Sequence, residues 1–357
     1  MVSRLRKDMA ANRGMGIRNE WSRWIVQFIH GRHARKPLSP KDAPEKRPRL
    51  WWAAVKWPMY GVAVMPALVA AGWLLGPGRA AWRLQLQQLV VFLLAAVLLL
   101  AWENLCNDYF DAQTGIDIRK PHSVIQLTGA PGMVFVVAQV CCLLGLVLMA
   151  RVAMASSWWA LVLVLAACCC GYLYQGPPFR LGYQGLGEPL CWLAFGPLAT
   201  AAALVGLGAP APGLEGGGGG PLDLFLAGQL GCGPALATTL VLFCSHFHQV
   251  EDDVAHGKRS PVQRLGTARA AALVPCLVAL VLLAEVVPVA WGRVWPATTL
   301  VALASLPAAF PLIRLLARRH NQPERIGHGK FLALRFQMVN GVLFAGGLAL
   351  GRWPVAS

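Results

Sequence analysis

Nine apolar segments of about 20 residues follow one another after Leu50 and constrain the fold more than any other feature. They span residues 51–76, 84–107, 132–153, 157–175, 187–208, 222–247, 267–291, 295–316 and 329–350. At about 1.5 Å of rise per residue, a helix of this length crosses a hydrocarbon layer about 30 Å thick. Only 13% of the residues are charged, about half the fraction usual in soluble domains. We therefore expect an all-α fold, a polytopic integral membrane bundle of nine transmembrane helices.

The N-terminal residues 1–49 differ from the rest of the chain because they are polar and rich in arginine. Residues 1–50 contain 13 basic and 4 acidic side chains, a net +9 out of the chain's formal +16. The remaining basic residues flank apolar segments, which favours lipid headgroups over nucleic acid as the partner. We expect a basic N-terminal tail or possible transit region at 1–49 and a membrane domain at 50–352.

The basic residues of the connections divide unequally between the two sides of the membrane. Connections after segments two, four, six and eight contain Arg119, Lys120, Arg180, Lys258, Arg259, Arg264, Arg318, Arg319, Arg325 and Lys330. Those on the opposite side, with the C-terminal end, contain only Arg79, Arg83, Arg151, Arg293 and Arg352. This asymmetry agrees with the positive-inside rule and places the basic tail on the side of the even-numbered connections.

The ten cysteines do not indicate a disulfide framework or a zinc site. Most lie inside apolar segments, where free cysteine acts as a small packing residue. Cys244, His246 and His248 lie close in sequence, but no second ligand pair follows at a suitable spacing. Packing and polar contacts are the better interpretation of these three residues.

Acidic residues cluster strongly in the membrane domain. Of twelve acidic residues after residue 50, seven fall within 102–117 and 246–258: Glu103, Asp108, Asp111, Asp117, Glu251, Asp252 and Asp253. Both segments end even-numbered helices, so both are expected at the same membrane face. Carboxylates beside apolar sequence cost several kcal/mol unless they are paired or bind a cation. The clusters are therefore candidate functional sites.

The residue types in these clusters are suited to Mg²⁺ bound to a diphosphate. Glu103, Asn107 and Asp111 recur at every fourth position, which places their oxygen donors on neighbouring faces of a helix. Such hard ligands suit Mg²⁺ and do not suit zinc. Basic residues directly after each cluster can neutralise phosphate oxygens. The residues alone indicate a membrane-embedded enzyme that acts on a diphosphate with an apolar tail.

These segments also resemble a known family. NDYFDAQTGID (107–117) resembles the NDxxDxxxxxD signature of the membrane aromatic prenyltransferases, the 4-hydroxybenzoate polyprenyltransferase superfamily, and VEDDVAHGKRSPVQRLGT (250–267) is similar to its second acidic motif. Within the superfamily, the resemblance is strongest to the 1,4-dihydroxy-2-naphthoate phytyltransferases of cyanobacteria and plastids. It rests on AAVKWPMYGVAVMP (53–66), YQGPPFRLGYQGLGEPL (174–190) and HFHQVEDDVAHGKRSP (246–261) and covers about residues 50–350.

The resemblance implies two Mg²⁺ ions that bridge the diphosphate. Asn107, Asp108 and Asp111 would bind the first ion, with Asp117 nearby. Asp253 would serve the second ion, helped by Glu251 or Asp252. Many relatives have Asp where this chain has Gln249. This departure leaves open which of the three acidic residues at 251–253 bind metal.

The resemblance also implies substrate-binding roles for basic and aromatic residues. Lys120 and Lys258, with Arg259 or Arg180, would bind phosphate oxygens, and Lys56 would face the aromatic substrate or the diphosphate. Tyr174 would stabilise an allylic cation through its ring face. Simpler alternatives are that Lys56 only extends toward the membrane surface and that Tyr174 and Arg180 only shape a turn.

The activity implied is transfer of a phytyl group from phytyl diphosphate to 1,4-dihydroxy-2-naphthoate, with loss of CO₂ and pyrophosphate, to give demethylphylloquinone. Polyprenyl transfer to the same acceptor and prenyl transfer to homogentisate remain alternatives. An ion-coupled transporter is a distant one, because its acidic residues would lie at mid-bilayer depth. The implied location is a chloroplast membrane, inner envelope or thylakoid, with a cyanobacterial membrane as the alternative. Tail length and oligomeric state remain open.

Overall fold

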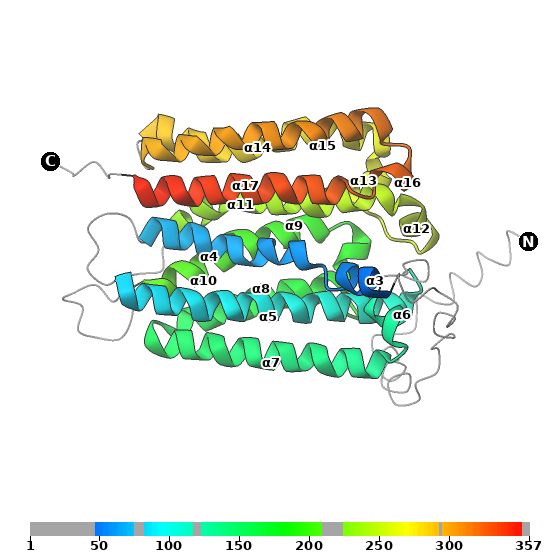
Figure 1. Cartoon of the computed structure of the whole chain (residues 1–357), viewed down its shortest axis with the longest axis horizontal. Coiled ribbons are helices and arrows are strands. Elements are labelled where there is room, and N and C mark those ends of the chain that lie inside the picture. The colour runs from blue at the N-terminus through cyan, green and yellow to red at the C-terminus, as the bar shows by residue number, and fades with distance from the viewer. Residues whose placement is uncertain (1–46, 75–81, 117–122, 209–223, 293–294, 352–357) are drawn as a thin grey trace, which may run out of the picture.

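A computed structural model describes residues 47–74, 82–116, 123–208, 224–292 and 295–351, and all its regular elements are helices. Long helices run side by side in one bundle (Figure 1). In this part of the chain, nine segments are long and apolar enough to cross a membrane. They are Leu50–Leu74, Leu86–Thr114, Pro131–Ala155, Trp158–Gln175, Gly187–Leu207, Leu224–His248, Thr267–Ala290, Ala297–Arg319 and Pro323–Leu350. The prediction of an all-helical bundle with nine spans is confirmed.

The elements follow the order of the apolar segments, with short helices in several connections. The first five spans and their connections comprise α3 (Arg47–Ala54), η1 (Trp57–Tyr60), α4 (Gly61–Leu74), α5 (Trp82–Thr114), α6 (Val124–Thr128), α7 (Pro131–Ala155), α8 (Trp158–Gln175), η2 (Leu181–Gln184), α9 (Gly187–Leu193), η3 (Ala194–Leu198) and α10 (Ala199–Leu207). The remainder comprises α11 (Leu224–Ser245), η4 (His246–His248), α12 (Val250–Ala255), α13 (Pro261–Leu265), α14 (Thr267–Gly292), η5 (Ala297–Ser305), α15 (Leu306–Arg319), α16 (Pro323–Ile326) and α17 (Gly329–Leu350).

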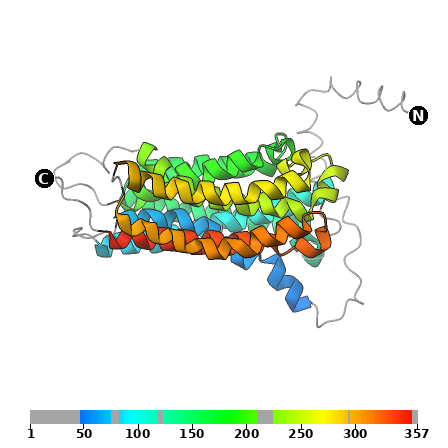
Figure 2. The same ribbon diagram turned by 90° about the horizontal axis from the view of Figure 1, so that it is seen from above.

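The first span is interrupted near its start. Lys56 has a left-handed backbone with φ 53° and separates α3 from η1. Pro58 has no N–H to bond back to the end of α3, so α3 cannot continue through it, whereas in the first turn of η1 that N–H is not needed. As a result α3 leaves the bundle at an angle (Figure 2).

The second span is longer than its apolar segment. We expected it to end near 107, whereas α5 continues to Thr114. Backbone hydrogen bonding extends the helix through the polar residues, so Asn107, Asp108 and Asp111 stand on its last turns. This end of α5 lies at the same end of the bundle as α12 and α13 (Figure 1).

Helices α4 and α17 pack closely because small residues line their contact. A Cβ on Gly72 would overlap the carbonyl oxygen of Ala345, and one on Gly341 would overlap the sulfur of Met65. The outer surface of the bundle, by contrast, exposes large apolar side chains such as Leu143 and Val147 on α7. That surface suits a hydrocarbon environment.

Candidate active site

Asp108 stands at the centre of the first acidic motif and is buried. Lys56 Nζ lies 2.7 Å from Asp108 Oδ1, and the backbone N–H of Val124 donates to Asp108 Oδ2 over 3.1 Å. Lys56 was expected near a substrate. The interruption of the first span places the Lys56 ammonium group against Asp108 of the first acidic motif. This group neutralises a carboxylate that would be costly to bury alone.

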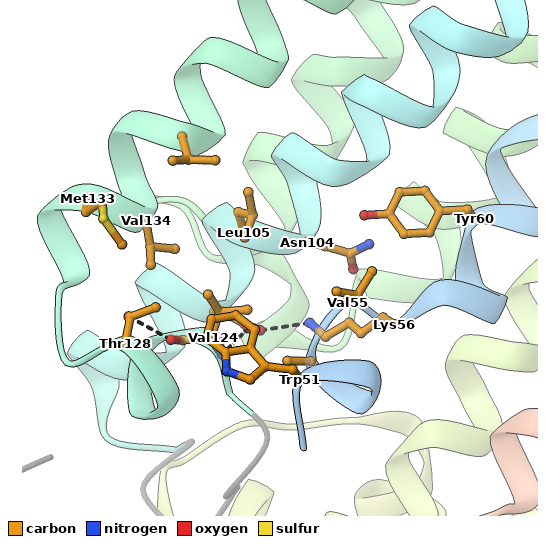
Figure 3. A pocket seen from close by; sticks show the side chains of 13 residues that line it. Trp51, Val55, Lys56, Tyr60, Asn104, Leu105, Val124, Thr128, Met133 and Val134 are labelled. Atoms are coloured by element: carbon orange, nitrogen blue, oxygen red, sulfur yellow. Dashed lines mark hydrogen bonds and ion pairs between the residues drawn. The ribbon is translucent and has the colours of Figure 1, made fainter. Parts of the chain in front are cut away.

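A cavity of about 320 Å³ adjoins this ion pair. Figure 3 shows Lys56, Asn104 and Tyr60 at the cavity, with Trp51 and Met133 at other parts of its wall. The remaining lining residues are Ala54, Val55, Leu105, Asp108, Val124, Thr128, Val134 and Val137. A mostly apolar wall with a few polar groups at one point is typical of a small-molecule site.

Asp111 is held by a residue from a distant part of the sequence. Tyr183 of η2 donates its hydroxyl to Asp111 Oδ1 over 3.1 Å, and the same hydroxyl lies 2.8 Å from Thr114 Oγ1. Burial, together with the charge of Asp111, raises the pKa of Tyr183, so the hydroxyl keeps its proton and donates.

The second acidic motif presents one fully buried carboxylate, that of Asp253 on α12. Lys258 Nζ lies 3.8 Å from Asp253 Oδ1 and 5.6 Å from the centre of the Tyr183 ring. Burial alone would raise the pKa of Asp253, but the hydrogen bond with His246 and the charge of Lys258 outweigh it and lower the pKa. Asp253 is therefore ionised at neutral pH.

Tyr183 and its neighbours connect the two acidic segments. The Arg259 N–H donates to the Tyr183 carbonyl over 2.8 Å. Gly185 has φ 80°, and a Cβ there would lie 2.6 Å from the Arg259 carbonyl oxygen. Only glycine permits this approach without strain. The structure thus links Asp111, Lys258 and Asp253 through η2, although the two motifs are far apart in sequence.

The other predicted site residues lie in different settings. Glu251 and Arg259 are exposed, whereas Asn107, Asp252, Tyr174 and Arg180 are half-buried. Arg180 has φ 43°, and its Nε is buried with no hydrogen-bond partner among the described residues. The Tyr174 ring packs on Gly182 and Gly187, where an added Cβ would lie 2.8 and 2.6 Å from Cε2. Asp117 and Lys120 lie outside the described residues.

Sequence reasoning overlooked Tyr183, Glu188 and His246. The first two belong to the string 174–190 that carries the family resemblance, but nothing in their spacing points to Asp111 or Asp253. For His246, packing and polar contacts were favoured over a zinc site, but no partner was named. Instead, its Nδ1 lies 3.3 Å from Asp253 Oδ2, and its Nε2 lies 3.4 Å from Glu188 Oε1.

The donor set fits a magnesium ion completed by substrate. Among the described residues, no three His, Cys, Asp or Glu side chains are close enough to hold a metal on their own. Mg²⁺ typically takes one or two carboxylates and fills its remaining positions with water and phosphate oxygens. Asp253 Oδ1 is buried and has no hydrogen-bond partner among the described residues. It is therefore available as a carboxylate oxygen ligand for the ion.

Two curated relatives are similar over most of the chain. The 2-carboxy-1,4-naphthoquinone phytyltransferase of Synechocystis sp. is 42% identical over 312 residues, which cover 87% of this chain and 96% of the relative. The chloroplastic 2-carboxy-1,4-naphthoquinone phytyltransferase of Arabidopsis thaliana is 36% identical over 325 residues, which cover 89% of this chain and 81% of the relative.

Two solved structures share the fold. A UbiA homolog from Archaeoglobus fulgidus, bound to DMAPP and Mg²⁺, aligns with a TM-score of 0.53 at 17% identity and covers 82% of this chain and 99% of its own. A digeranylgeranylglyceryl phosphate synthase aligns with a TM-score of 0.50 at 15% identity, and the alignment covers 85% of this chain and 98% of the synthase. Residues 63–334 match the UbiA prenyltransferase family. With that match and two relatives above 30% identity, the chain belongs to the UbiA family of integral membrane prenyltransferases.

Proposed function

We propose that the protein transfers a phytyl group from phytyl diphosphate to 1,4-dihydroxy-2-naphthoate, with release of pyrophosphate and CO₂. The 42% identity to the Synechocystis enzyme over 87% of this chain is the observation that carries the proposal. The names of both relatives give the acceptor as the quinone. We propose that the ring reacts in its dihydroxy form, because an electron-rich ring captures an allylic cation.

The protein's residues divide the work between the diphosphate and the acceptor. Asn107, Asp108 and Asp111 at the end of α5 and Asp253 on α12 are proposed to hold two Mg²⁺ ions with the diphosphate, with Asp117 and either Glu251 or Asp252 as further candidates. Bound Mg²⁺ supplies Lewis-acid stabilisation of the negative charge that develops on the departing pyrophosphate. Lys258, Arg180, Lys120 and Arg259 are proposed to bind phosphate oxygens.

The cavity beside Lys56 is the proposed acceptor site. Its mostly apolar wall suits fused aromatic rings, and Lys56, which lines the cavity, is proposed to attract the acceptor's carboxylate. Tyr174 is proposed to face the allylic cation. After carbon–carbon bond formation at the carboxyl-bearing ring carbon, CO₂ leaves with no net proton and the aromatic ring is restored. A site shielded from bulk water protects the cation from hydrolysis.

We further propose a photosynthetic membrane environment, chloroplast or cyanobacterial, because the two relatives come from a cyanobacterium and a chloroplast.

The test is mass spectrometry of products from membranes that contain the protein, Mg²⁺, the naphthoate acceptor and equal amounts of phytyl, geranylgeranyl and solanesyl diphosphates. The acceptor is supplied in parallel as quinone and, with reductant, as dihydroxy-naphthoate. We expect the phytylated 1,4-dihydroxynaphthalene as the immediate product, detected as phytylated naphthoquinone after oxidation by air during extraction, and formed faster from the dihydroxy form of the acceptor.

Variants Asp111→Ala and Asp253→Ala should abolish turnover while the protein accumulates normally in the membrane. A solanesyl product would reassign the donor. Turnover of homogentisate in place of the naphthoate would reassign the acceptor.

A further inference from the structure

His246 connects two carboxylates from different elements inside the bundle. It lies in η4, the last turn of the sixth span, and is 3% exposed. Its Nδ1 lies 3.3 Å from Asp253 Oδ2 on α12, and its Nε2 lies 3.4 Å from Glu188 Oε1 in the first turn of α9. One imidazole ring thus spans the gap between the fifth span and the second acidic motif.

These contacts make the two oxygens of Asp253 unequal. Because an ionised carboxylate can only accept, Nδ1 donates to Oδ2. Oδ1 has no hydrogen-bond partner among the described residues and faces Lys258 Nζ at 3.8 Å. The backbone of Asp253 is held on both sides, since its N–H donates to the Gln249 carbonyl and its own carbonyl accepts from the Lys258 N–H.

From this geometry we infer that Glu188 and His246 are positioning residues for the prenyl diphosphate site. His246 occupies Oδ2 and thereby fixes Asp253 so that Oδ1 serves the Mg²⁺–diphosphate. The carboxylate of Glu188, 3.4 Å from Nε2 and outside hydrogen-bond geometry, favours by its charge the ring orientation that makes this contact. The inference rests on the proposed prenyl transfer, but it does not depend on which acceptor is used. Partners that orient a metal-binding side chain typically change metal affinity 10- to 100-fold when they are removed.

The variants separate the two contacts of the ring. In His246→Asn the amide nitrogen takes the place of Nδ1 and keeps the contact with Asp253. In His246→Gln it takes the place of Nε2 and keeps only the contact with Glu188. Glu188→Gln keeps a partially negative oxygen beside the ring, whereas Glu188→Ala removes it. His320→Asn is the matched control. His320 lies between α15 and α16, α16 is at the same end of the bundle as α12 and α13 (Figure 1), and His320 Nδ1 contacts Thr267 Oγ1 at 3.1 Å.

The measurement is the Mg²⁺ concentration that gives half-maximal binding of geranylgeranyl thiolodiphosphate, an unreactive donor analogue, to the full-length protein in detergent by calorimetry. We expect an increase of about tenfold in His246→Gln and Glu188→Ala. The half-saturation should stay within about threefold of the unmodified protein in His246→Asn, Glu188→Gln and His320→Asn. Melting temperatures recorded without Mg²⁺ separate a loss of folding from a loss of binding.

Two results would overturn the inference alone: unchanged half-saturation in both His246→Gln and Glu188→Ala, or equal weakening in His246→Asn and His246→Gln. If either His246 variant fails to fold, the comparison of Glu188→Ala with Glu188→Gln tests the inference in its place: equal half-saturation in these two variants would overturn it. Failure of the unmodified protein to bind the analogue with Mg²⁺ would instead overturn the proposed function, and with it the inference.

Discussion

Two residues carry backbone strain, and both were predicted to bind substrate. In the described part of the chain, Lys56 and Arg180 are the non-glycine residues with positive φ. A left-handed conformation costs an ordinary residue about 1–2 kcal/mol. Such strain persists where the surroundings fix the residue, often at functional sites. For Lys56, the ion pair with Asp108 supplies that restraint.

The strain and the charge at Lys56 can be separated by mutation. Lys56→Met removes the ammonium and keeps the strain, whereas Lys56→Gly removes both. We expect kcat/KM to fall about 30-fold in both variants, because the buried Asp108 loses its counter-charge, a loss of about 2 kcal/mol. Lys56→Gly should melt at a higher temperature than Lys56→Met. Lys56→Arg is the control that keeps the charge, and activity in Lys56→Met equal to the unmodified protein would contradict this role.

At the level of helices, close contact between α4 and α17 holds the span that carries Lys56 in the bundle. The same first span carries Lys56 at one end and Gly72 near the other. Inside the bundle, α17 also donates from Asn340 Nδ2 to Glu285 Oε2 of α14 over 2.9 Å. Small residues and buried polar pairs are the interactions that hold helices together within a membrane.

Replacement of Gly72 by alanine tests the contact between α4 and α17. The added methyl group would overlap the Ala345 carbonyl, which should destabilise the protein by about 1–3 kcal/mol. Gly346→Ala on α17 is the matched control, because an added Cβ there meets nothing within 4 Å. Thermal unfolding can be followed with a thiol-reactive dye, since Cys106 and Cys244 are buried. Equal melting temperatures in the two variants would show that the contact can relax.

Across the whole molecule, the features predictable from sequence are those that a lipid environment dictates. A helix must be long and apolar to cross a bilayer, so the nine spans were visible from composition alone. A break between the third and fourth spans was predicted at 154–156, and the structure places it at Ser156–Ser157, where Ser157 caps α8 by accepting from the Trp159 N–H. The end of α5 was not predicted correctly. Its last turns are rich in polar residues, so the apolar pattern stops before the backbone hydrogen bonds of the helix do.

The candidate site was predictable only in part, for a physical reason. Asp108, Asp111 and Asp253 stand out because charges beside apolar sequence are costly. Tyr183 and His246 have no such signature, since their roles depend on partners that folding brings close. The hydroxyl of Tyr183 reaches an aspartate 72 positions away, and nothing in the local pattern encodes that contact.

The orientation of the whole bundle is the remaining prediction. The nine spans found in the described residues place the C-terminal end of α17 on the side opposite the acidic motifs, and the positive-inside rule places the motifs in the cytoplasm of a bacterial host. In Escherichia coli, alkaline phosphatase fused after Gly351 should be active and green fluorescent protein fused there should be dark. Fusions after Gln322, which follows eight spans, should behave in the opposite way. Fluorescence from the fusion after Gly351 would contradict this orientation, because the basic connections would then face the periplasm.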